Sequence, residues 1–212
     1  MASIVDSARA SNGGRVLTGI KGLDCILRGG LIRGNSLLIQ GPPGSAKTTL
    51  GIQTLVNGIN LFNENAILLS MEQYPEQIIR DAKGFGWDLS GAIQENRLRI
   101  QTIRPHDLYH SLTGEDSQAI VDIREAKESL GAKRILVDSI THFYRTQQPV
   151  EEQDRVFTEF LQALRQIGLT ALLIAELPNA SANLHSHITY VVDAVMNTHY
   201  DYDPRAGYRK RW

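Results

Sequence analysis

The stretch from residue 36 to residue 55 constrains the fold most, because an apolar run passes through a glycine-rich turn into a helical pattern. Residues 36–40 read Ser-Leu-Leu-Ile-Gln, residues 41–48 read Gly-Pro-Pro-Gly-Ser-Ala-Lys-Thr, and residues 49–55 have helical spacing. This order is the context of a phosphate-binding loop, in which backbone N–H groups and a helix N-terminus surround phosphate oxygens. We therefore predict a nucleoside triphosphate site formed by Gly41, Pro42, Pro43, Gly44, Ser45, Ala46, Lys47, Thr48 and Thr49.

Two side chains of this loop have predicted contacts with the ligand. Lys47 would reach the β- and γ-phosphates, and the Thr48 hydroxyl would bind Mg²⁺. One position departs from the usual pattern GxxxxGK(S/T), because Ala46 stands where the second glycine is expected. A methyl group fits there if the residue has helical φ, and otherwise it crowds the phosphate.

Composition indicates a compact domain without a strong electrostatic field. The 212 residues are 42% hydrophobic and 21% charged, which suits one domain with a sizeable core. A net charge of −1 argues against a nucleic acid or an anionic membrane as partner. No apolar run approaches the length of a bilayer span. We expect a flexible segment over residues 1–14, without the hydrophobic middle of a signal peptide, and one domain over residues 15–212.

The chain has a single cysteine, Cys25, which excludes an intramolecular disulfide and a cysteine-cluster zinc site. One thiol suits a reducing compartment, so we expect a cytoplasmic protein. Because Cys25 lies between Leu23 and Ile26, we also expect it to be a small buried apolar residue.

Apolar segments and helical patterns alternate along the chain. The expected strands are 36–40, 66–70, 98–103, 134–138, 170–175 and 190–197. The expected helices are 47–62, 75–85, 117–130 and 151–166. Strands separated by such helices imply right-handed crossovers, so the predicted fold class is α/β, with a mostly parallel sheet and helices on both faces. Ligands of such sheets bind at the carboxyl ends of the strands, where the glycine-rich loop lies.

Three expected strands lead into an acid at that edge. Asp138 would hold Mg²⁺ through its water shell, next to the phosphate loop. Glu72 would orient and deprotonate the attacking water, unless it caps the helix that begins near Pro75. Glu176 either senses the γ-phosphate or caps its strand, and the sequence leaves both roles open.

Taken together, these motifs resemble a KaiC-type domain of the RecA superfamily. The similarity covers nearly the whole chain and is carried by residues 15–24, 29–34, 41–48, 71–78, 84–88, 137–139 and 192–194. The resemblance implies a RecA-like P-loop ATPase fold and a homo-oligomer, a hexameric ring with ATP between adjacent subunits. It also implies an ATP- and Mg²⁺-dependent reaction, with catalytic roles for Lys47 and Glu72 and binding roles for Thr48, Thr49 and Asp138.

Two departures from the family bear on turnover. Gln73 stands where the family usually has a second glutamate, and an amide cannot accept a proton at neutral pH. Glu72 keeps the first position, so we still expect hydrolysis, at a slow rate. Relatives also continue into a Lys-x-Arg pair that reaches the neighbour's γ-phosphate. We expect Arg209 and Arg211 to precede that pair, which a truncation at the C-terminal end would remove.

One further segment resembles a particular part of the family. Residues 186–190, Ser-His-Ile-Thr-Tyr, followed by Asp193, are similar to the stretch in which the carboxyl-terminal domain of KaiC phosphorylates hydroxyls across the ring interface. Thr189 and Tyr190 fall on the acceptor positions, and Glu72 would then deprotonate a neighbour's hydroxyl instead of water. The alternative is an ordinary strand that starts with β-branched and aromatic residues.

Histidine pairs raise the question of a second metal. His106 and His110, and likewise His185 and His187, have spacings that can hold zinc. No acidic or cysteine partner accompanies them at a persuasive distance, so Mg²⁺ with the nucleotide is the one metal that we expect.

Three functions stay open. The first is a ring ATPase that switches an unidentified protein partner, and the second is a DNA-handling RecA relative of the repair type. Loops 177–185 and 139–151 carry one Lys or Arg between them, Arg145, which argues against nucleic acid as a partner. The third is a nucleotide-dependent scaffold that hardly turns over, which Ala46 and Gln73 allow.

Overall fold

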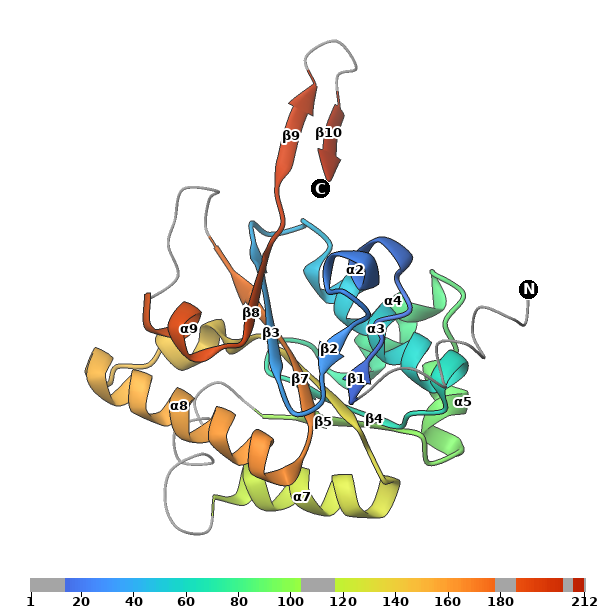
Figure 1. Cartoon of the computed structure of the whole chain (residues 1–212), viewed down its shortest axis with the longest axis horizontal. Coiled ribbons are helices and arrows are strands. Elements are labelled where there is room, and N and C mark those ends of the chain that lie inside the picture. Colours follow the sequence, from blue (N-terminus) through green and yellow to red (C-terminus); the bar gives the residue numbers. More distant parts are fainter. Residues whose placement is uncertain (1–13, 104–116, 178–185, 204–207, 212) are drawn as a thin grey trace.

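A six-stranded parallel sheet forms the centre of the molecule, with the strand order β5-β4-β6-β7-β3-β8 (Figure 1). The computed structural model describes residues 14–103, 117–177, 186–203 and 208–211. The strands of the sheet are β3 (Ser36–Gly41), β4 (Ala66–Ser70), β5 (Leu98–Thr102), β6 (Arg134–Asp138), β7 (Thr170–Glu176) and β8 (Ala194–Asn197). All five pairings are parallel, which confirms the predicted α/β class.

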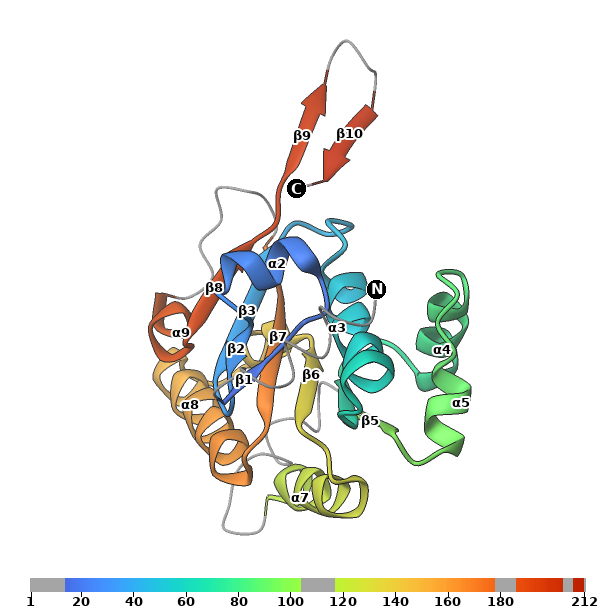
Figure 2. The same ribbon diagram turned by 45° about the vertical axis from the view of Figure 1, so that its right-hand side comes forward.

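Two hydrophobic cores cover the two faces of the sheet, because side chains of a strand alternate between them. In β6, Ile135 and Val137 belong to one core and Leu136 to the other. Figure 2 shows the helices of the first core on one side of the sheet and those of the second on the other. The first core is covered by α7 (Gln118–Leu130), η1 (Ile140–Tyr144), α8 (Val150–Ile167) and α9 (Ser186–Val191). The second is covered by α3 (Lys47–Phe62), α4 (Pro75–Lys83) and α5 (Leu89–Gln94).

Helix α3 lies close against β6 because two glycines face the strand. A Cβ at Gly51 would lie 2.6 Å from Leu136 Cδ1, and one at Gly58 would lie 2.5 Å from the Arg134 guanidinium. Arg134 is fully buried, and it donates hydrogen bonds to Glu64 and to backbone carbonyls of neighbouring segments. The helix that follows the phosphate loop is therefore fixed on the sheet.

Smaller elements surround this body. Helix α2 (Lys21–Ile26) is enclosed between β1 (Arg15–Val16) and β2 (Leu31–Ile32), which pair antiparallel. At the other end of the chain, β9 (Tyr200–Asp203) and β10 (Tyr208–Arg211) form an antiparallel hairpin. Figure 1 shows this hairpin projecting from the body beyond β8.

Two expectations from the sequence are wrong. Residues 186–191 form the helix α9, and the strand begins only at Ala194, because Ile188 and Val192 are buried at helical i, i+4 spacing. Cys25 is exposed, since Leu23 is the buried residue of the short helix α2. The other predicted helices and strands are confirmed to within two residues at each end.

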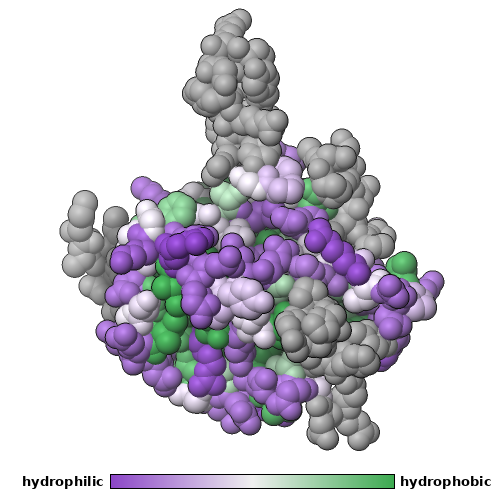
Figure 3. Space-filling model, turned by 180° about the vertical axis from the view of Figure 1, so that it is seen from behind, coloured by the Kyte–Doolittle hydropathy of each residue, from purple (hydrophilic) through white to green (hydrophobic). Residues whose placement is uncertain are grey.

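The described surface is largely polar. On the face shown in Figure 3, hydrophilic groups predominate, and hydrophobic groups reach the surface in narrow areas between them. Among the described residues, no helix has the length and hydropathy of a membrane span.

Candidate active site

The phosphate loop connects the carboxyl end of β3 to the first turn of α3, as the sequence predicted. Lys47 opens the helix and is buried, with its Nζ donating a hydrogen bond to the Pro42 carbonyl at 2.9 Å. Burial lowers the pKa of Lys47, and the surrounding carboxylates oppose this shift; these are Glu176, Asp138 and Glu72. The lysine therefore lies among the three strand-end acids that the sequence singled out.

The residue before Lys47 has an unusual backbone. Ala46 has φ 69° and ψ 23°, in the left-handed region, so the condition of an ordinary helical φ is not met. An alanine in this region is strained by about 1–2 kcal/mol relative to the right-handed helical region. This explains why a glycine is usual at this position of a phosphate loop.

Thr48 and Asp138 are in direct contact. The Thr48 hydroxyl donates a hydrogen bond of 2.7 Å to Asp138 Oδ2. Burial raises the pKa of Asp138 to about 6, and the hydrogen bond from Thr48 works in the opposite direction. A hydroxyl and a carboxylate that meet beside a phosphate loop are oxygen donors of the kind that Mg²⁺ binds. The pair therefore fits the predicted metal.

Glu72 lies beside Asp138 because strand pairing continues past the end of β4. The Met71 N–H donates a hydrogen bond of 2.7 Å to the Asp138 carbonyl. The Ser70 hydroxyl donates to the Gln73 carbonyl and accepts from the Gln73 N–H, which closes the turn that contains Glu72. Glu72 Oε1 lies 3.1 Å from His142 Nε2, and this hydrogen bond holds the pKa of Glu72 below its ordinary value.

Glu72 is not the cap of the following helix. The N-cap of α4 is Tyr74, whose backbone N–H donates to the Gln77 side chain at 3.2 Å. The capping alternative for Glu72 is therefore wrong.

Glu176 is the last residue of β7, at the same edge. Its backbone N–H donates to the Thr141 hydroxyl at 2.8 Å, and its Oε2 lies 3.7 Å from Arg145 Nη2. The side chain contributes to the electrostatics of Lys47, and its two predicted roles, phosphate sensor and strand end, stay predictions.

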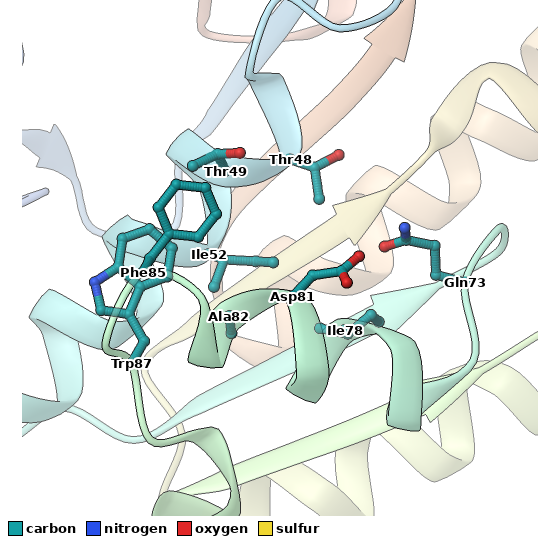
Figure 4. A pocket seen from close by; sticks show the side chains of 9 residues that line it. All are labelled: Thr48, Thr49, Ile52, Gln73, Ile78, Asp81, Ala82, Phe85 and Trp87. Atoms are coloured by element: carbon teal, nitrogen blue, oxygen red, sulfur yellow. The ribbon is translucent and has the colours of Figure 1, made fainter.

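A pocket of about 340 Å³ adjoins the first turn of α3 (Figure 4). Figure 4 shows Thr48 and Thr49 along one side, Gln73 at one end, and the rings of Phe85 and Trp87 at the other. The two rings are stacked, with centroids 5.0 Å apart. A cavity that adjoins a phosphate loop and carries a stacked aromatic pair suits a planar base.

Comparison with known families agrees with this arrangement. A family model described as "ATPase: KaiC" matches residues 16–210. The chain belongs to the KaiC ATPase family. Its P-loop and its parallel sheet are those of the RecA superfamily to which KaiC domains belong.

Individual KaiC proteins are similar to this chain over much of its length. The circadian clock oscillator protein KaiC of Prochlorococcus marinus subsp. pastoris is 34% identical over 164 residues, 76% of this chain and 32% of that protein. KaiC of Synechococcus elongatus is 33% identical over the same shares of the two chains. The match thus spans about a third of the length of these curated relatives.

Thr198 is a residue of this KaiC-family domain that sequence reasoning missed. It follows β8, and its hydroxyl lies 2.7 Å from the Ser45 hydroxyl of the phosphate loop and 3.2 Å from the Gln40 carbonyl. A Cβ at Gly41 would collide with the same hydroxyl. A lone threonine in a coil carries no pattern from which this contact could be predicted.

The aromatic pocket and His142 were also missed. Phe85 and Trp87 are part of the resemblance to KaiC, but no rule of spacing connects them to the base. His142 follows the strand-end acid Asp138 by four residues, and this proximity was a usable signal.

The predicted phospho-acceptors lie on α9. Tyr190 is 86% exposed, and Thr189 is partly buried. Of the histidines considered for zinc, His187 contacts the Thr158 hydroxyl at 2.9 Å, whereas His106, His110 and His185 lie outside the described residues. Among the described residues there is no cluster of three or more metal-binding side chains.

Proposed function

We propose that this chain is a Mg²⁺-dependent ATPase domain in which Glu72 is the general base. The observation that carries the proposal is the meeting of Lys47, Thr48, Asp138 and Glu72 at one edge of the sheet, beside an aromatic pocket. Membership of the KaiC ATPase family supports the same reaction.

The residues of the loop bind and orient the triphosphate. Lys47 leaves the Pro42 carbonyl and donates to the β- and γ-phosphate oxygens, where its charge offsets theirs. The backbone N–H groups at the start of α3 face the same oxygens. Phe85 and Trp87 stack on the base, which fixes the far end of the ligand.

Glu72 accepts the proton of the attacking water. It lies in the row of strand-end acids next to Asp138, and its lowered pKa keeps it ionised at neutral pH, as a base requires. Thr48 and Asp138 would hold Mg²⁺, the Asp138 carboxylate partly through water. Bound Mg²⁺ would supply positive charge that offsets the negative charge of the phosphates.

The test is a timed incubation of the chain with γ-labelled ATP and Mg²⁺, following both free phosphate and label on the protein. We expect Lys47→Ala to lose nucleotide binding and Glu72→Gln to bind ATP without releasing phosphate. Unchanged ATP affinity in Lys47→Ala contradicts the site, and persistent hydrolysis in Glu72→Gln moves the base elsewhere.

A ring of identical subunits, with ATP between neighbours, is the assembly that the family resemblance implies. Sedimentation of the full chain with and without ATP and Mg²⁺ tests it, because nucleotide at an interface shifts the oligomer by mass action. A species of six subunits that forms only with nucleotide supports the ring, and a monomer under both conditions contradicts it. The protein partner that such a ring would switch, and a cytoplasmic location, stay predictions of the sequence.

The alternatives are outcomes of the same incubation. Label retained on Thr189 or Tyr190 indicates an autokinase, and bound ATP without either signal indicates a nucleotide-dependent scaffold. Binding of single-stranded DNA is not favoured, since Arg145 is the one basic residue of loops 139–151 and 177–185 and it lies 3.7 Å from the Glu176 carboxylate.

A further inference from the structure

His142, on η1, is a hydrogen-bond partner of Glu72. Its Nε2 lies 3.1 Å from Glu72 Oε1, and its side chain is 12% exposed against 33% for Glu72. The 3-10 helix η1 starts just after Asp138, so the chain turns back over the strand edge and brings the imidazole to the carboxylate.

The chemistry of the pair fixes the direction of the hydrogen bond. An ionised carboxylate only accepts hydrogen bonds, so His142 donates its Nε2–H to Glu72. After His142, the nearby Ser139 side chain also lowers the pKa of Glu72. Because a carboxylate has about four lone-pair positions, Glu72 keeps acceptor capacity for a water molecule.

The residues on either side of His142 are anchored in the fold. On one side, the Thr141 N–H donates to the Ser139 hydroxyl at 3.2 Å, and the Thr141 hydroxyl accepts from the end of β7. On the other side, the ring of Phe143 packs 5.4 Å from the rings of Phe157 and Phe160 in the core. The backbone that carries His142 is therefore anchored on both sides, which favours a constant position of its side chain next to Glu72.

We propose that His142 is a positioning residue for hydrolysis, which holds the Glu72 carboxylate in the orientation that accepts the proton of the attacking water. This inference rests on the proposed ATPase function. In the step concerned, the water oxygen bonds to the γ-phosphorus while the bond from that phosphorus to the β,γ-bridging oxygen breaks. The proton of the water passes to Glu72, and ADP leaves with the bridging oxygen.

The sequence makes such a support more consequential in this chain. Gln73 replaces the second glutamate usual in the family, so a single carboxylate is available as base at this position. When no second carboxylate can replace the base, a loss of its orientation lowers the rate of hydrolysis, because the base must lie within hydrogen-bond distance of the proton that it accepts.

The experiment compares kcat and ATP dissociation constants of the full chain and of three variants. We expect His142→Ala to lower kcat about tenfold, as for the loss of a hydrogen bond to a charged group, with unchanged ATP affinity. His142→Gln, which keeps a donor near the Nε2 position, should restore kcat to within about threefold. His187→Ala, which removes a histidine on α9, should leave kcat unchanged.

Circular dichroism and ATP affinity show whether His142→Ala is folded, and the Gln variant serves as the test if it is not. An unchanged kcat in folded His142→Ala, or a failure of Gln to restore it, overturns the positioning role. Absence of hydrolysis in the unmodified chain, or hydrolysis that survives Glu72→Gln, overturns the proposed function and this role with it. The two failures are thus told apart by the unmodified chain and by Glu72→Gln.

Discussion

Thr48 and Asp138 are 90 residues apart in the chain, and a hydrogen bond of 2.7 Å joins the hydroxyl of the one to Oδ2 of the other. The contact forms because the first turn of α3 packs on β6, which Gly51 and Gly58 allow. It brings the Asp138 carboxylate into a buried position beside the phosphate loop, and removing this charge from water lowers the free energy of unfolding.

The cost at Asp138 depends on pH. Burial raises the pKa of Asp138 to about 6 from an ordinary 3.8, so the folded state binds this proton more tightly than the unfolded state. Stability is therefore lost as the pH rises from about 4 to about 6. We therefore expect Asp138→Asn to raise the free energy of unfolding at pH 8 by about 1–3 kcal/mol relative to the unmodified chain. At pH 4 the two free energies should differ little. Urea denaturation in the presence of a chelator measures both.

Asp122→Asn, on α7 and away from the site, is the control for this measurement. Its free energy of unfolding, relative to that of the unmodified chain, should be no higher at pH 8 than at pH 4. A gain for Asp138→Asn that is the same at both pH values would assign the effect to packing and not to the charge.

The left-handed residues of the phosphate loop give a pair of opposite predictions. Ala46→Gly removes the strain of a Cβ at φ 69°, and the free energy of unfolding should rise by about 0.5–1 kcal/mol. Gly44→Ala introduces the same strain at φ 75°, and the free energy of unfolding should fall by a similar or larger amount. Urea denaturation of both variants checks this, and changes of the same sign would contradict it.

The stacked rings of Phe85 and Trp87 are predicted to contribute to the affinity for ATP. Phe85→Ala removes one of the stacked rings, and base stacking is worth about 1–3 kcal/mol, so the ATP dissociation constant should rise about tenfold or more. Tyr74→Ala removes an aromatic side chain outside the pocket lining, and it should leave the constant unchanged. Equal effects of the two substitutions in equilibrium titrations would argue against the base site.

The buried guanidinium of Arg134 predicts a large loss of stability. Glu64 is its carboxylate partner and also lies 2.6 Å from Arg33, so Glu64→Ala leaves a buried charge without a counterion. We expect a loss of about 3–5 kcal/mol in the free energy of unfolding. Glu95→Ala, which breaks an exposed pair 3.9 Å from Arg97, should cost less than about 1 kcal/mol. A small loss for Glu64→Ala by thermal or urea unfolding would show that water reaches Arg134.

The sequence predicted the sheet and the acids because each depends on a local pattern. Asp138 and Glu72 end apolar runs, and parallel strands bring their carboxyl ends together whatever the order of the strands. The wrong expectation at residues 190–197 has a local cause too. β-branched residues favour a strand, and the packing of Ile188 and Val192 on the core outweighs that preference.

What the sequence did not predict depends on contacts between distant segments. The imidazole of His142 meets Glu72 across 70 residues of chain, because β4 and β6 are neighbours in the sheet. Such pairs become visible only when the strand order is known.

The hydroxyl of Thr198 connects the end of the edge strand β8 to the phosphate loop, through Ser45 and the Gln40 carbonyl. Only His199 separates this threonine from the first residue of the projecting hairpin. A displacement of the hairpin would therefore be transmitted to Thr198, and to the Ser45 hydroxyl that it contacts, through one intervening residue.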